Sequence, residues 1–205
     1  MIRRPLVVSF VLLALLTSCL PAADTRPEIM LLNAPSDTRV DGLATAFEAA
    51  LREQPSAYAY QFTFRPAARF QERHRNMAPA AAPLQAAFAA RALGSDYPVM
   101  VSAPVYERHV DTFFGNRRRI ETAASVRAII IDPTTAEVVA TFVSPVYRRV
   151  RVVSIDPAHP DLAPLAEDPD LAAVTTRALY DLAPVVSRTL FDLVGGPPSP
   201  LTESP

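Results

Sequence analysis

The charged side chains of this sequence favour binding over catalysis. All 20 basic residues among the 205 are arginine, so chemistry that needs a lysine, such as a Schiff base or a P-loop, is excluded. The 21 acidic residues leave a formal net charge of −1, which excludes a strongly basic nucleic-acid binder. The sequence contains no G-x-S-x-G motif to expose a nucleophilic serine, and we expect no enzymatic activity.

The three histidines, at positions 74, 109 and 159, do not form a recognisable ligand set. His109 and Asp111 are expected on one face of a strand, a spacing that some metal sites use. Neither a cysteine nor a second histidine lies nearby to complete a first coordination shell. We therefore interpret both residues as part of a solvated strand face and predict neither a metal nor a cofactor.

Two clusters of arginine offer a binding chemistry. They comprise Arg117, Arg118 and Arg119 after a predicted hairpin turn, and Arg148, Arg149 and Arg151 on a later predicted strand. The planar guanidinium suits phosphate and carboxylate groups, so these six residues are the candidate contacts with an anionic surface or a partner. The alternative interpretation is that charge on an edge strand prevents strand-to-strand aggregation.

The first nineteen residues are typical of an export signal. Arg3 and Arg4 precede a largely apolar run from Leu6 to Leu16, which is too short to span a membrane. The run ends in Leu16-Thr17-Ser18-Cys19, which resembles the lipobox of bacterial lipoproteins. The resemblance implies cleavage before Cys19 and its acylation, palmitate included. The alternative, a plain signal peptide, would leave the chain's only cysteine without a disulfide partner in the same chain.

These signals predict the organisation of the chain. Residues 1–18 are expected to be removed, residues 19–28 to form the lipidated Cys19 and a short tether, residues 29–194 to fold as one domain, and residues 195–205 to be a disordered proline-rich tail. At about 3.5 Å per residue the tether reaches roughly 30–35 Å, which holds the domain close to its bilayer. The expected location is a bacterial membrane, the outer membrane facing the periplasm if the cell has one.

Hydrophobic periodicity predicts the elements that position these side chains. Strands are predicted at residues 29–34, 58–64, 99–103, 138–143 and 146–153, and helices at residues 43–51, 84–93 and 169–194. Asp41 and Asp168 are the expected helix caps. The second helix is expected to bury Leu84, Ala87, Phe88 and Ala92. This order predicts an α/β fold, a mixed and largely antiparallel sheet with helices packed on it.

Residues 105–131 are typical of a long β-hairpin around Gly115-Asn116. A three-residue loop, Gly115 to Arg117, is favoured because it pairs Thr112 with Ile120 and so matches the apolar faces; it also pairs Asp111 with Glu121. Pro145 cannot donate a ladder hydrogen bond, so the strand after it is expected at a sheet edge or past a bend.

Two turns carry a resemblance to a known family. Gly94-Ser95-Asp96-Tyr97 leads into a strand, and a later strand ends in Asp132-Pro133-Thr134-Thr135-Ala136-Glu137. These segments resemble the curli-secretion lipoprotein and penicillin-binding-protein activator superfamily, with Gly-x-Asp-Tyr and Asp-x-x-Thr-Gly-Glu turns, over Ile29 to Val153. Ala136 stands where the family usually has glycine, so this turn must avoid a positive φ or accept strain.

The resemblance implies an envelope lipoprotein, and the residues narrow its role. The activator branch carries a long linker that the short tether does not match. In the secretion branch, hairpins build an oligomeric pore, but Arg108 on the apolar face would meet lipid near mid-depth at a cost of about 2–4 kcal/mol per subunit. We therefore expect a membrane-anchored, non-enzymatic protein-interaction or assembly-accessory module, a monomer or small oligomer that binds another envelope protein. A ligand-binding or enzyme-like periplasmic domain and a channel subunit are the alternatives.

Overall fold

The computed structural model describes residues 26–34, 42–53, 62–66, 82–154 and 164–194. The strands are β1 (Glu28–Asn33), β2 (Thr63–Pro66), β3 (Tyr97–Phe114), β4 (Arg117–Ile131), β5 (Val138–Val143) and β6 (Tyr147–Ser154). The helices are α2 (Leu43–Arg52), α4 (Ala82–Leu93), the short 3₁₀ helix η3 (Leu165–Glu167) and α5 (Pro169–Leu193). Cys19, the predicted tail and the first part of the strand predicted at 58–64 lie outside these residues.

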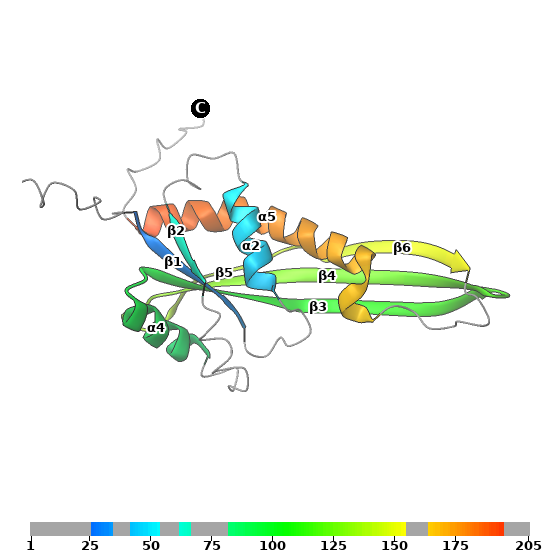
Figure 1. Cartoon of the computed structure of the whole chain (residues 1–205), viewed down its shortest axis with the longest axis horizontal. Helices are drawn as coiled ribbons and strands as arrows, with labels where there is room; N and C mark the ends of the chain where they lie inside the picture. Colours follow the sequence, from blue (N-terminus) through cyan, green and yellow to red (C-terminus); the bar gives the residue numbers. More distant parts are fainter. Residues whose placement is uncertain (1–25, 35–41, 54–61, 67–81, 155–163, 195–205) are drawn as a thin grey trace, which may run out of the picture.

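The six strands form one mixed sheet in the order β2-β1-β3-β4-β5, with β6 also paired to β4. β1 runs parallel to β2 and to β3, whereas β4 is antiparallel to β3, β5 and β6. The predicted fold class is therefore confirmed. β3 and β4 are much longer than their neighbours, and their hairpin projects beyond the first turn of α5 (Figure 1).

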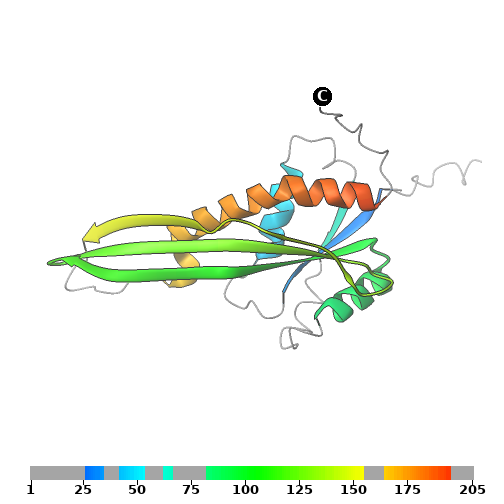
Figure 2. The same cartoon turned by 180° about the vertical axis from the view of Figure 1, so that it is seen from behind.

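Helices cover the two faces of the sheet unequally. α2 and α5 lie on one face, where Phe47, Leu179 and Leu190 pack against β-strand residues such as Val101 and Val126. α4 lies on the other face, near the start of β1 (Figure 2). Its alanines pack against a separate set of apolar residues, Met30, Leu32, Met100 and Ile131. The second face of the long hairpin carries no helix among the described residues.

The orientation of α4 differs from the prediction. Its buried residues are five alanines, at positions 82, 86, 87, 89 and 90. Leu84 and Phe88 are instead 58% and 65% exposed, and Ala92 is exposed as well. Because Gln85 and Arg91 are the two polar residues in this helix, periodicity did not identify its inward face. The alanine side allows closer approach to the sheet, so the large side chains point outward.

The start of α2 is capped by a residue from another element. Gly42, at φ 77°, occupies the N-cap position and supplies no side-chain oxygen. The Asn33 Oδ1 at the end of β1 accepts a hydrogen bond from the Ala44 N–H over 2.6 Å. The predicted cap, Asp41, lies outside the described residues; within them, the capping oxygen comes from Asn33 at the end of β1.

The hairpin register also differs from the prediction. The loop has two residues, since Phe114 pairs with Arg117, and Gly115 adopts a left-handed φ of 56°. A register shift between Thr112 and Phe114 places Val110 opposite Ile120. A β-bulge thus matches the apolar faces without the three-residue loop. It also places Asp111 opposite Arg119, not Glu121.

β5 and β6 form one interrupted edge along β4. The interruption is Ser144-Pro145-Val146, and it confirms the bend predicted at Pro145. The Ser144 Oγ accepts a hydrogen bond from the Val126 N–H over 2.9 Å, and the Ser144 N–H bonds back to the Val126 carbonyl. The Ser144 hydroxyl therefore provides the acceptor for the Val126 N–H of β4 at the point where the edge strand is interrupted.

None of the helices within the described ranges is long and apolar enough to cross a membrane.

Candidate functional site

The structure brings the six predicted arginines onto two adjacent strands, β4 and β6. The register places Arg119 opposite Val152, and Ala123 opposite Arg148. The six do not form one patch, because successive residues of a strand point to opposite faces of the sheet. They separate into a group that contacts α5, a group on the open face, and a group at the hairpin tip.

Arg149 and Arg151 belong to an ion-pair network at the start of α5. The Arg149 Nε lies 3.1 Å from Asp170 Oδ1, and the Arg151 Nε lies 2.7 Å from Asp170 Oδ2. Arg151 also approaches Asp168 Oδ2 at 3.7 Å, and Arg108 Nη1 reaches the same oxygen at 3.0 Å. These arginines hold α5 onto the hairpin. In the pore considered from the sequence, Arg108 would face lipid. In this structure it faces the start of α5 instead.

Asp168 joins this network to the helix itself. Its Oδ1 accepts hydrogen bonds from the backbone N–H groups of Asp170 and Leu171, which confirms the predicted cap. The side chain is fully buried. Burial raises the pKa of this carboxyl, but the hydrogen bonds from Arg108, Leu171 and Asp170 and the charge of Arg151 outweigh it, and the pKa lies below its usual value.

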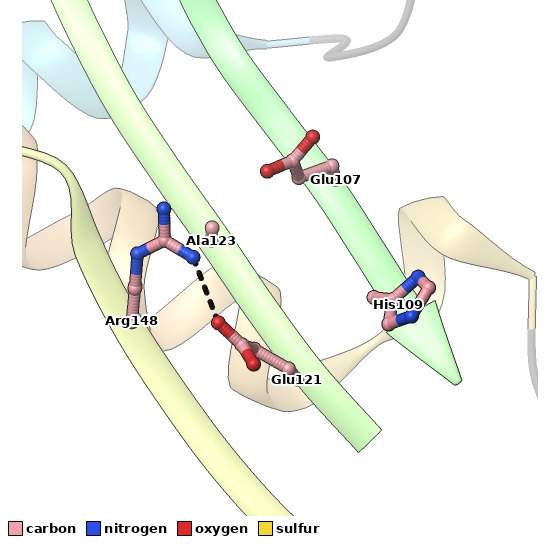
Figure 3. Close-up of a pocket in the computed structure, with 5 residues that line it drawn as sticks. All are labelled: Glu107, His109, Glu121, Ala123 and Arg148. Carbon is pink, nitrogen blue, oxygen red and sulfur yellow. Dashed lines mark hydrogen bonds and ion pairs between the residues drawn. The ribbon is translucent and has the colours of Figure 1, made fainter. Parts of the chain in front are cut away.

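Arg148 and Arg119 belong to the open face of the hairpin. The Arg148 Nη1 donates to Glu121 Oε1 over 2.7 Å, and Arg119 lies 3.5 Å from the other oxygen of Glu121. The same face holds a hollow of about 310 Å³ lined by Glu107, His109, Glu121, Ala123 and Arg148 (Figure 3). Within this hollow Arg148 and Glu121 already neutralise each other.

His109 and Asp111 lie on one strand face, as predicted, with His109 Nε2 2.9 Å from Asp111 Oδ1. Both side chains are at least half exposed. The described part of the chain contains no group of three or more histidine, cysteine, aspartate or glutamate side chains placed to hold a metal ion.

A second hollow, of about 460 Å³, lies at the opposite end of the sheet. Asp96 and Asp132 contribute carboxylates to its lining, together with Tyr97, Leu193 and Val194. Asp96 Oδ2 accepts a hydrogen bond from the Glu28 N–H over 2.7 Å. Asp132 accepts from the N–H groups of Thr135 and Thr134, which lower its pKa. Asp132 therefore acts within its own turn, whereas the Asp96 carboxylate binds the start of β1 to the start of β3.

The hairpin tip is the remaining candidate site. Phe113 and Phe114 are 58% and 80% exposed there, on the residues that precede Gly115. Arg117 and Arg118 are on the returning strand, and Arg118 Nη1 donates to the carbonyls of Gly115 and Arg117 over 3.3 Å each. Two large aromatic side chains thus lie beside two guanidinium groups that form no ion pair with a carboxylate among the described residues.

The tip lies far from the start of the described domain. β3 begins beside β1, where Tyr97 is paired with Ile29, and it is 18 residues long, ending at Phe114. At about 3.3 Å per residue, the strand spans roughly 55–60 Å. Figure 1 shows the two ends at opposite extremes of the molecule. The arginines of the tip are therefore remote from the end that a tether through residue 28 would hold.

Sequence reasoning identified the arginines but missed the two phenylalanines and the ion-pair network. The signal for the network was available, since Arg108 interrupts an otherwise apolar strand face. The signal for the tip was the Phe-Phe pair directly before a Gly-Asn turn, because hairpin loops are exposed. The pairing register of β4 with β3 and β6 determines which arginines lie close enough to a carboxylate to form an ion pair.

Among known proteins, this chain is similar to solved structures. No family model and no curated protein matches the chain. The PelC dodecamer from Paraburkholderia phytofirmans is 13% identical, with a TM-score of 0.39, over 80% of this chain and 92% of that chain. Lipoprotein GNA1162 from Neisseria meningitidis is 13% identical (TM-score 0.38, over 82% and 97%), and a minor lipoprotein from Acinetobacter baumannii is 11% identical (TM-score 0.33, over 82% and 94%).

Bacterial lipoproteins thus recur among the solved structures that this chain resembles, and lipoprotein is also the class that its sequence predicts. Likeness at this identity and TM-score does not transfer a function. The narrower resemblance to the curli-secretion and activator superfamily stays a prediction.

Proposed function

We propose that this chain is an exported envelope lipoprotein, attached to a bacterial membrane through acylated Cys19, and that it acts as a non-enzymatic protein-interaction module. The observation that carries the proposal is the hairpin tip. Phe113 and Phe114 are exposed beside Arg117 and Arg118, at the end of a hairpin that extends past its covering helix.

The composition of the tip suits a protein partner. Aromatic side chains and arginine are enriched among the residues that contribute most to binding at protein interfaces. The phenylalanines would supply apolar area, and the arginines would recognise carboxylates on an acidic partner. The partner is therefore an envelope protein with an apolar pocket bordered by acidic residues. Of the six candidate arginines, Arg117 and Arg118 are the ones that we assign to this contact.

The alternatives have weaker support. The hollow in Figure 3 contains a closed Arg148–Glu121 pair, so an ionic ligand would first have to separate two side chains that lie 2.7 Å apart. A channel subunit would present the hairpin to lipid, but α5 packs on one face of that hairpin through Arg108 and Asp168. We propose neither catalysis nor a pore.

Site-specific photo-crosslinking tests the contact. A photoreactive residue replaces Phe114 in one variant and Val185 in another, because Val185 is an exposed residue in the middle of α5. We expect a discrete adduct with one envelope protein from position 114 and none from position 185. Adding Arg117→Ala and Arg118→Ala to the first variant should abolish the adduct. An adduct that is equally strong from both positions, or unaffected by the arginine substitutions, would contradict the proposal.

Membrane fractionation tests the anchor separately. The Cys19→Ala variant should remain uncleaved by the lipoprotein peptidase and lose its acylation, and the chain should leave the membrane fraction once its apolar leader is removed. Unchanged membrane attachment of a cleaved, unacylated Cys19→Ala protein would refute lipid anchoring while leaving the crosslinking result intact.

A further inference from the structure

α4 carries an outward apolar stripe that nothing within the described residues covers. Leu84, Phe88 and Ala92 lie four residues apart, so they form one line along the exposed side of the helix. The Arg91 guanidinium carbon lies 5.9 Å from the centre of the Phe88 ring. α4 contains no acidic residue. The stripe therefore combines apolar side chains with one cation and no charge that a membrane surface would repel.

The stripe lies beside the point where the chain from Cys19 enters the domain. The Ser95 N–H bonds to the Ala90 carbonyl at the end of α4. Directly afterwards the Asp96 N–H bonds to the Glu28 carbonyl over 2.8 Å, and the Glu28 N–H bonds to Asp96 Oδ2 over 2.7 Å. Figures 1 and 2 both place α4 and the start of β1 at the same end of the molecule.

The length of the connecting chain restricts where this end can lie. Nine residues connect Cys19 to Glu28 when Glu28 is included, and at about 3.5 Å per residue they reach roughly 30–35 Å. An acylated Cys19 would keep the end of the domain that holds α4 within that distance of the bilayer surface. A single weak apolar contact becomes effective when a second attachment already holds the molecule at the membrane.

We propose that the outward stripe of α4 rests on the lipid surface to which Cys19 is attached. This inference depends on the proposed lipid anchor. Phe88 and Leu84 enter the boundary between head groups and acyl chains, and Arg91 extends its guanidinium into the head groups. The contact makes α4 the membrane side of the sheet. α5 and its ion-pair network, on the other face, are then directed away from the bilayer.

Fluorescence quenching by lipid tests the proposal directly. The chain contains no tryptophan, so Phe88→Trp in the full-length, lipidated protein introduces a single reporter. The matched control is Phe114→Trp, which makes the same substitution at an exposed phenylalanine of the hairpin tip. Each variant is reconstituted into phosphatidylethanolamine–phosphatidylglycerol vesicles, with and without brominated acyl chains. We expect about twofold quenching and a blue shift for Phe88→Trp, and neither for Phe114→Trp.

A second substitution removes the apolar contact while leaving the anchor in place. Leu84→Asp in the Phe88→Trp background places a carboxylate in the middle of the stripe, and we expect it to abolish quenching without releasing the protein from the vesicles. Quenching that persists in this double variant would overturn the proposal.

The remaining outcomes distinguish this inference from the anchor itself. Absence of quenching at position 88 in protein that floats with the vesicles overturns the α4 contact and leaves the anchor standing. A blue shift without quenching by brominated lipid shows that protein covers the stripe, which also overturns it. Protein that does not float with the vesicles refutes the anchor, and the α4 contact is refuted with it.

Discussion

Arg108, in the middle of β3, donates a hydrogen bond over 3.0 Å to Asp168, the N-cap of α5. The two residues are 60 positions apart in the sequence, and their side chains are 15% and 0% exposed. Asp168 therefore serves as the helix cap and as a counterion for the hairpin. This relationship links the stability of the long hairpin to the position of α5.

Removal of the Asp168 carboxylate should destabilise the protein strongly. Asp168→Ala removes the cap and leaves Arg108 buried without this counterion, so we expect the free energy of unfolding to fall by about 3–5 kcal/mol. Urea unfolding followed by circular dichroism measures the change. Asp181→Ala, at an exposed position of the same helix, is the control and should alter stability by no more than about 0.5 kcal/mol. Equal losses for the two variants would contradict the role of the network.

The same carboxylate should make stability depend on pH. The pKa of Asp168 is lower in the folded protein than in the unfolded chain, where it lies near 3.9, so its contribution is fully present above that value and is lost as pH falls through the folded pKa. The difference in unfolding free energy between the wild type and Asp168→Asn should stay constant above about pH 5 and shrink below about pH 4. A difference that does not vary between pH 7 and pH 2 would refute this assignment.

The turn at Ala136 should gain stability from glycine. Ala136 has a φ of 63°, so the turn accepts the strain that a glycine would avoid. We expect Ala136→Gly to raise the free energy of unfolding by about 0.5–1 kcal/mol, because relief of the left-handed strain exceeds the added entropy of the unfolded chain. Ala173→Gly, on the exposed side of α5, should have the opposite sign and a similar size. Thermal unfolding of both variants decides the point; a loss of stability at position 136 would show that the turn is unstrained.

The hydroxyl of Ser144 should contribute more to the free energy of unfolding than the hydroxyl of an exposed serine. Ser144→Ala leaves the Val126 N–H without its acceptor at the break in the edge strand, and we expect a loss of about 1–3 kcal/mol. Protection of the Val126 amide from hydrogen exchange should fall at the same time. Ser154→Ala, at the exposed end of β6, should change neither measurement. If Ser144→Ala changes stability and exchange protection no more than Ser154→Ala does, the Ser144 hydroxyl does not stabilise the break between β5 and β6.

Local patterns predicted the elements well because they depend on neighbouring residues. Asp168-Pro169 predicted the start of α5, and Pro145 predicted the bend in the edge strand. Periodicity failed for α4, because alanine, leucine and phenylalanine are all apolar and only the close approach of the sheet selects the smaller ones. It failed for the hairpin register as well, because a single bulged residue at Phe113 shifts the pairings on the side away from the loop, from Thr112 back to Val105.

The candidate site was predictable only in part for the same reason. Six arginines were visible in the sequence, yet whether an arginine is available to a partner depends on the carboxylate that lies across from it. Arg149 and Arg151 meet Asp170 from α5, and Arg148 meets Glu121 from β4. Arg117 and Arg118 remain at the tip beside two exposed phenylalanines.

The sequence by itself determined the class of the fold, the order of its elements and the helix cap at Asp168, since hydrophobic period, turn chemistry and capping act over a few residues. Only the tertiary structure decided the register of the hairpin, the side of α4 that faces solvent, and the residue that caps α2. Each of these depends on contacts between segments far apart in the chain, such as Asn33 with Ala44 and Arg108 with Asp168, where packing selects among arrangements that local preference leaves nearly equal.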